Sequence, residues 1–272
     1  MRGPNPIDFD KWLRDRSRQA DFDLADVELY QRKANQPFSG VLGDAELKAC
    51  MNTGQVVIDP FEPELLNSSS YDVRLGGNYY VAEKVGDRVD FSPYTKEEVE
   101  LYYSGPHKAT THEQWCKQHR RQPFAGIDRD EHIIVLAPGE CILAHTVEYI
   151  GASYGITTMM KARSSLGRIN ISSCDDAGWG DVGYINRWTM EIRNKNTSVW
   201  VPLVVGMPIA QMIFFWVAAS TIDYGTTGHY QSGVDIRKLQ KAWRPEGMLP
   251  KLYSSSNTAL RKKLSKDKKT GF

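Results

Sequence analysis

From about residue 55 onward, short apolar or alternating segments follow one another and are separated by Gly, Pro, Asn or Asp. This is the pattern of β-strands joined by turns. The segments expected to be strands are QVVIDPF (55–61), SSYDVRLGGNYYVAE (69–83), HIIVLAPGECILAHTVEYI (132–150), YGITTMMKARS (154–164) and WTMEIRN (188–194). Many short strands with few helices predict a barrel or sandwich of mostly antiparallel strands.

Helical patterns are confined to a few places. Residues 1–40 carry apolar side chains at loosely helical spacing, which predicts one or two appended amphipathic helices. A short helix is expected to open at Asp44 and to close at Gly54. The segment 87–130 is rich in charge and His; we interpret it as a surface insertion with helical turns at KEEVELYY and HEQWCKQHRRQ.

The expected organisation is therefore a helical extension (1–40), a β domain (41–233) interrupted by the insertion, and a C-terminal extension (234–272). The last fifteen residues hold six Lys or Arg against one Asp. Such a basic tail can touch phosphates, but solvated disorder is the favoured interpretation.

Composition excludes several classes of protein. The 272 residues are 41% hydrophobic, and 34 basic against 33 acidic side chains leave a net charge of +1, so no overall field favours nucleic acid or membranes. The four cysteines form no CxxC pair, which speaks against a zinc cage or a disulfide framework and favours a reducing, cytoplasmic setting. The uncharged stretch 199–219 contains a Gly-Met-Pro turn, so two buried strands are expected there rather than a membrane span.

Most familiar catalytic motifs are missing. His107, His112, His119 and His132 match no metal-binding spacing and are expected at the surface. There is no GxSxG elbow, no Walker loop, no dinucleotide fingerprint and no zinc deaminase motif.

Candidate chemistry is densest between residues 161 and 194. Arg163, Ser164, Ser165 and Arg168 surround a turn containing Gly167, a group that suits phosphate, although a capped turn with solvated arginines remains an alternative.

Three aspartates, Asp175, Asp176 and Asp181, surround an Ala-Gly-Trp-Gly loop. Its two glycines would let a flat ligand approach the backbone, and the carboxylates would suit sugar hydroxyls. In such a loop aspartates are also common as plain turn formers.

In the segment WTMEIRN, strand alternation places Trp188, Met190 and Ile192 on one face and Thr189, Glu191 and Arg193 on the other. Glu191 therefore faces either solvent or a polar pocket. In a pocket, burial raises the pKa of a glutamate and a nearby cation lowers it, which makes it a tunable proton carrier.

Several segments together resemble the dCTP deaminase branch of the dUTPase-like superfamily. They are VIDPFEPELLNSSSYDVRLG (57–76), the strand pair 136–148, RSSLGR (163–168), the gap-free match 177–194, VGMPIAQMIFF (205–215) and the lid-like HYQSG (229–233). The resemblance covers about residues 41–233. It implies a mainly β fold, a distorted β-barrel with a few short helices. It also implies assembly as a homotrimer with active sites at subunit interfaces.

The resemblance further implies hydrolytic removal of the cytosine 4-amino group of dCTP without zinc. Carried over by position, Glu191 is the proton shuttle, Ser164 holds the base and its water, and Arg168 orients Glu191. The expected substrate-binding residues are Arg163 and Ser165 for phosphate, Asp181 for the deoxyribose 3'-hydroxyl, Tyr230 with Gln231 for the triphosphate from the lid, and also Ala177 and Tyr184. Mg²⁺ is expected to arrive with the triphosphate, and dTTP is a candidate inhibitor.

Two other functions stay open beside deamination to dUTP. One is a bifunctional enzyme that also splits dUTP into dUMP and pyrophosphate, because relatives with "AGWID" resemble residues 177–181. The other is a nucleotide-binding regulator without turnover.

Departures from the family pattern affect the base. Relatives commonly read "H-x-T-A" where this chain reads Cys174-Asp175-Asp176-Ala177, so Asp176 replaces a hydroxyl near the base, which could retune the site toward a modified cytosine. Gly180 replaces the usual Ile, Asn186 the usual Gly, and His229 a lysine of the lid.

Overall fold

A computed structural model describes residues 40–82, 90–175, 177–217, 224 and 235–267 of the chain. The predicted N-terminal helices and the lid residues Tyr230 and Gln231 lie outside these ranges. The described strands are β1 (Gly40–Val41), β2 (Val56–Asp59), β3 (Tyr71–Ala82), β4 (Tyr103–Lys108), β5 (Thr110–Thr111), β6 (His132–Leu136), β7 (Cys141–Ala152), β8 (Ile156–Ala162), β9 (Ile171–Ser172), β10 (Trp179–Gly180), β11 (Ile185–Asn194), β12 (Val201–Val204) and β13 (Pro208–Trp216). The helices are α3 (Asp44–Asn52), η1 (Pro63–Leu65), α4 (Lys96–Tyr102), α5 (His112–His119), α6 (Ser164–Arg168), α8 (Ile236–Ala242), η2 (Pro245–Met248) and α9 (Ser255–Asp267).

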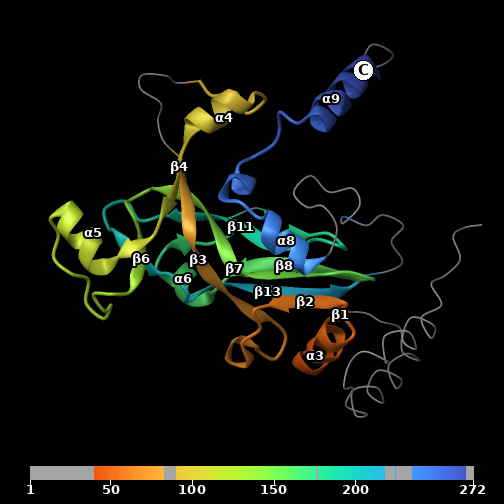
Figure 1. Ribbon diagram of the computed structural model, residues 1–272, viewed down its shortest axis with the longest axis horizontal. Helices are drawn as coiled ribbons and strands as arrows, with labels where there is room; N and C mark the ends of the chain where they lie inside the picture. The colour runs from red at the N-terminus through yellow and green to blue at the C-terminus, as the bar shows by residue number, and fades with distance from the viewer. Residues whose placement is uncertain (1–39, 83–89, 176, 218–223, 225–234, 268–272) are drawn as a thin grey trace, which may run out of the picture.

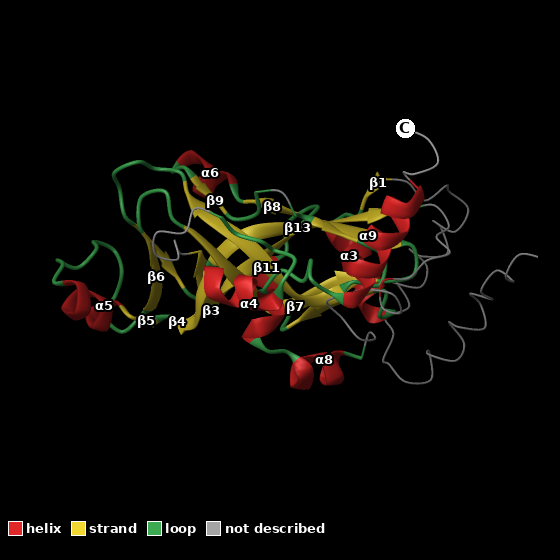
Figure 2. Cartoon of the chain, turned by 90° about the horizontal axis from the view of Figure 1, so that it is seen from above, coloured by secondary structure: helices red, strands yellow, loops and turns green. Residues whose placement is uncertain are grey.

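The fold is mainly β, as predicted, with a large curled sheet as its centre. Within the described residues this sheet runs β10-β8-β13-β3-β7-β11-β9, with β1, β2 and β4 added at its sides. A smaller sheet, β12-β6-β5, lies with α5 at one end of the molecule, and α3 lies at the other (Figures 1 and 2). All pairings within the described strands are antiparallel.

The main core lies between the layers of the curled sheet, and strand alternation supplies it. On β11, Trp188, Met190 and Ile192 are buried as the pattern predicts, and they join residues such as Tyr71 and Phe214 in one cluster. Burial of apolar area at roughly 25 cal/mol per Å² makes this cluster the main source of stability. The other face of β11 is thereby left for polar side chains.

The insertion is more deeply integrated than predicted. Its strand β4 pairs with β3 of the large sheet, and Val99 of α4 is fully buried. His112, expected at the surface, is also fully buried. Its ring contacts the carbonyl of Ile127 at 3.2 Å and accepts the N–H of Phe124 at 2.9 Å, so its polar atoms need no water.

Two further predictions, for the stretch 199–219 and for the basic tail, can be compared with the structure. The described part of the stretch 199–219, which ends at residue 217, forms β12 and β13 on either side of a turn, as predicted. The tail was expected to be disordered, but residues up to Asp267 form helix α9, in which Arg261 lies 5.0 Å over the ring of Tyr94. No helix in the described ranges is both long and apolar enough to cross a bilayer.

An irregular pairing between β7 and β11 shapes the centre of the sheet. Arg187 pairs with Tyr149 and Thr189 with His145, so β7 uses three residues where β11 uses only Trp188. This is a β-bulge. The N–H of Trp188 is satisfied by Thr146 Oγ1 at 2.9 Å instead of by a ladder partner.

A buried ion pair fixes the end of the bulge. Glu148 is fully buried, and it accepts from the backbone N–H of Arg74 at 2.9 Å and from its Nε at 2.6 Å. A carboxylate without water must find such charged donors within the protein.

We therefore expect Glu148→Gln to lower the free energy of unfolding by about 1–3 kcal/mol, because it removes the charge that binds Arg74 Nε and leaves Arg74 only the more distant carboxylate of Glu62, at 3.6 Å. Urea denaturation measures this loss. The exposed Glu97 of α4 supplies a control, since Glu97→Gln should change stability by less than about 0.5 kcal/mol. Equal stability of Glu148→Gln and wild type would contradict the assignment.

Candidate active site

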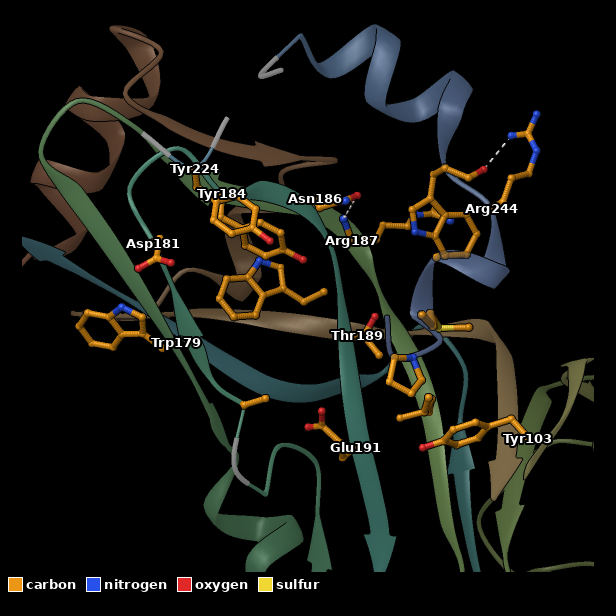
Figure 3. Close-up of a pocket in the computed structure, with 17 residues that line it drawn as sticks. Tyr103, Trp179, Asp181, Tyr184, Asn186, Arg187, Thr189, Glu191, Tyr224 and Arg244 are labelled. Carbon is orange, nitrogen blue, oxygen red and sulfur yellow. Dashed lines mark hydrogen bonds between the residues drawn. The ribbon is translucent and has the colours of Figure 1, made fainter. Parts of the chain in front are cut away.

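A cavity of about 410 Å³ opens on the polar face of β11. Its walls come from six parts of the chain: the turn before β11, β11 itself, Leu143 of β7, the start of β4, Tyr224, and the segment after α8 (Figure 3). Its size falls within the range of small-molecule sites. Four of the predicted site residues line it: Ala177, Asp181, Tyr184 and Glu191.

The floor of the cavity consists of side chains from two neighbouring strands. Arg187, Thr189 and Glu191 follow one another along β11 (Figure 3). They lie opposite Tyr149, His145 and Leu143 of β7, respectively. Glu191 thus faces a pocket rather than open solvent: the residue is half-buried and its Oε2 is fully buried.

Tyr103 brings a hydroxyl to the same cavity from the insertion. Burial raises the pKa of its phenol to about 12, and the nearby Glu191 adds to the shift. Tyr103 is therefore a neutral hydrogen-bond donor at physiological pH.

The turn that precedes β11 forms the mouth of the cavity. Asp181 is exposed there, and Tyr184 packs edge-on against Trp188 and Tyr224, with ring centroids 5.1 Å apart in both pairs. A polar group beside a fixed aromatic face suits a sugar ring with a hydroxyl.

The predicted phosphate-binding turn does not line this cavity. Ser164, Ser165 and Arg168 lie exposed on α6. Arg163 precedes that helix and pairs with the buried Asp72 at 3.1 Å. Within one chain, therefore, the structure does not bring Arg168 into the cavity that Glu191 lines.

The glycines before β11 have a different role from the predicted one. A Cβ on Gly178 would lie 2.4 Å from the carbonyl oxygen of Met160, and one on Gly180 would lie 2.3 Å from Thr158 Oγ1. These glycines let the chain pack closely against β8, so the space beside them holds protein rather than a flat ligand.

Asp175 is paired with two cations. Its carboxylate lies 2.8 Å from Lys195 and 3.8 Å from Arg193. The hydrogen bond from Lys195 holds the pKa of Asp175 below its usual range. Asp176 and His229 lie outside the described residues, as do the lid residues.

His145 is a buried neutral base beneath the cavity floor. Its Nδ1–H donates to the carbonyl of Thr146 at 2.8 Å, so Nε2 is the acceptor for the N–H of Asn78 at 3.3 Å. Burial lowers its pKa to about 4, and the charge of Arg187 adds to this effect. Its ring lies 4.6 Å from that of Trp243.

Several residues of the cavity carried no recognised signal in the sequence. Arg187 shares the strand alternation of Glu191, so that pattern alone would have found it. Tyr103, Trp243 and Arg244 come from segments expected to be peripheral, and no local pattern marks them. Among the described residues, no cluster of three or more His, Cys, Asp or Glu side chains could hold a metal ion.

Comparison with known proteins identifies the family of the chain. A family model for dCTP deaminase-like domains matches residues 41–217. A "dCTP deaminase, dUMP-forming" of Methanosphaerula palustris is 30% identical over 175 residues, 64% of this chain and 80% of the relative. One of Methanospirillum hungatei is 30% identical over 184 residues, 68% and 85% of the two chains.

A solved structure with a similar chain path is a 2'-deoxycytidine 5'-triphosphate deaminase from Agrobacterium tumefaciens. It is 18% identical in sequence, with a TM-score of 0.44. The match covers 71% of this chain and 54% of the solved chain.

The chain belongs to the dCTP deaminase-like family and is an enzyme of that family, which confirms the resemblance seen in the sequence.

The buried neutral His145 predicts a specific pH dependence of stability. Its pKa is about 4 in the folded chain, against an ordinary value of 6.5, so the unfolded chain binds more protons between these two pH values. Stability should fall as the pH drops from 6.5 toward 4, by about 3 kcal/mol for this group. Urea denaturation at several pH values should show a smaller fall for His145→Gln. An identical pH slope in the two proteins would contradict the buried neutral state.

Proposed function

We propose that this protein converts dCTP to dUMP, with Glu191 as the proton carrier of the deamination step. The observation that carries the proposal is the position of Glu191, with Oε2 buried, on the floor of a cavity whose mouth holds Asp181 and Tyr184. Membership of the dCTP deaminase-like family supports it. The curated relatives quoted above are named dUMP-forming, which favours dUMP over dUTP as the final product.

The first step replaces the amine of cytosine with oxygen. Water adds to C4 and gives a proton to the Glu191 carboxylate, which then protonates the departing amine; the products are dUTP and ammonia. One carboxylate can serve both transfers in sequence, and such catalysis contributes roughly 10²–10⁴-fold to the rate. Tyr103, kept neutral by its raised pKa, is a suitable donor to an oxygen or nitrogen of the ring.

The second step splits dUTP. A second water attacks the α-phosphorus, and dUMP and pyrophosphate leave. Mg²⁺ would enter as part of the substrate, bound by its phosphate oxygens, and would neutralise their charge. Asp181, exposed at the mouth, is placed to accept a hydrogen bond from the sugar hydroxyl and so to orient the nucleotide between the two reaction centres.

The cation and the two serines of α6 that belong to the proposed site have to come from a second copy of the chain. Arg168 and the serines of α6 are exposed and do not line the cavity of their own chain. In a homotrimer a heterologous interface can bring this helix to a neighbouring cavity. We infer that Arg168 reaches the Glu191 of another subunit in this way and helps to hold it in its charged state.

Glu191→Gln is expected to lower ammonia release from dCTP by about 10²-fold or more, because an amide cannot accept the proton of water. A coupled ammonia assay measures the rate, and chromatography of the products should give dUMP and pyrophosphate for wild type. Glu113→Gln, which changes an exposed glutamate of α5, is the matched control. A wild-type rate in Glu191→Gln would refute this mechanism, and accumulation of dUTP would refute the second step.

The shared site predicts complementation between two inactive variants. Glu191→Gln and Arg168→Ala should each be inactive alone. If copies mix at random after partial denaturation and refolding, about a quarter of the sites regain both groups, and that fraction of activity should return. A mixture that stays inactive, while the mass of the assembly shows that subunits exchanged, would place both groups in one chain.

A further inference from the structure

A segment outside the family match covers the floor of the cavity. The match ends at residue 217, whereas α8 and η2 span residues 236–248. Leu239 packs with Tyr149 of β7 and Ile185 of β11. Figure 1 shows α8 lying along this part of the sheet.

The same segment continues along β7 toward Glu191. Met248 and Leu249 are buried against Tyr80 and Leu143, and Leu143 is the residue that pairs with Glu191. Five residues of this stretch line the cavity: Trp243, Arg244, Gly247, Met248 and Pro250. Residues 236–250, called the C-terminal wall below, are therefore part of the cavity and not a separate extension.

The wall holds one cationic side chain of the floor in place. The guanidinium of Arg187 lies 5.0 Å over the ring of Tyr149 and 4.9 Å from the ring of Trp243, so it sits between two aromatic faces. Trp243 is in turn supported by His145 at 4.6 Å. Because His145 stays neutral, it adds no repulsion to the neighbouring guanidinium.

Arg187 has donors that the described protein does not use. Its Nε is buried and has no hydrogen-bond partner among the described residues, and no carboxylate there forms an ion pair with it. The other arginine at the cavity, Arg244, donates from Nη1 to the carbonyls of Lys241 and Trp243. A buried guanidinium donor without an acceptor is costly, and a ligand oxygen removes that cost.

The position of Arg187 fits a nucleotide whose base lies at Glu191. The two residues are four apart on the same face of β11, or about 13 Å at roughly 3.3 Å per residue. A nucleotide spans such a distance. Its oxygen acceptors are phosphate oxygens and the base carbonyl, both of which a planar guanidinium binds well.

We propose that the C-terminal wall is a built-in part of the substrate pocket and that Trp243, with Tyr149, positions Arg187 to donate to an oxygen of the bound nucleotide. This rests on the proposed function, because it takes a cytosine nucleotide as the occupant. Arg187 is then a substrate-binding residue, and Trp243 a positioning residue that acts through it.

Binding to the full-length chain tests this directly, with Glu191→Gln as the background so that dCTP is not consumed. Calorimetry with dCTP and with deoxycytidine compares Arg187→Gln, Arg187→Lys, Trp243→Ala and Trp243→Phe. Lys241→Gln removes an exposed cation of the wall and is the matched control. We expect Arg187→Gln and Trp243→Ala to weaken dCTP binding about tenfold or more, Trp243→Phe to retain most of the affinity, and the control to bind as the background does.

The two ligands identify the oxygen. A loss seen with dCTP and not with deoxycytidine assigns Arg187 to phosphate, and an equal loss with both assigns it to the base carbonyl. In the active enzyme, which retains Glu191, Arg187→Gln should raise KM for dCTP with little change in kcat. Unchanged dCTP affinity in Arg187→Gln and Trp243→Ala, with unchanged thermal melting, overturns the proposal.

Failure of the proposed function has a different outcome. If the wild-type chain binds dCTP through Arg187 but releases no ammonia, the proposed deamination is wrong and the assignment of the C-terminal wall still holds. A chain that deaminates dCTP equally well with Arg187→Gln, at the same KM, removes the wall assignment alone.

Discussion

Where β7 passes Trp188, three of its residues, Thr146 to Glu148, face a single residue of β11. A bulge of this kind leaves backbone groups without ladder partners, so its neighbours have to satisfy them. Thr146 accepts from the N–H of Trp188 and donates to the carbonyl of Glu148, and Glu148 is bound by Arg74. Each polar contact fixes the next, and together they define how β7 and β11 lie against each other.

The number of extra residues that β7 has in the bulge decides which side chains reach the cavity. Between the flanking pairs β11 advances by two residues and β7 by four. Both steps are even, and side chains alternate with a period of two, so no side chain changes face. Arg187 and Tyr149 therefore stay on the face that also carries Glu191 and Leu143. An odd shift would have turned one half of the floor into the core.

The sequence predicts those features that depend on local order. Alternation along 188–194 was enough to assign the buried face of β11 and to leave Glu191 on the polar one, and turn residues marked most strands. The bulge was not predictable, because it depends on the pairing of two strands. Neither was the C-terminal wall, whose short helices have few apolar residues. Leu239 and Met248 attach this segment to β7 and β11, and contacts between residues so far apart in the sequence leave no local pattern.

Charge links the wall to the proposed assembly. The described residues that line the cavity include two acidic side chains, Asp181 and Glu191, and two basic ones, Arg187 and Arg244. Such a balanced site does not offset the several negative charges of a triphosphate, even with Mg²⁺ bound to it. Arg168, the exposed basic residue of α6, adds positive charge to the site if a second copy lends it. The wall would then close the cavity from within the chain, and the neighbouring α6 would close it from outside.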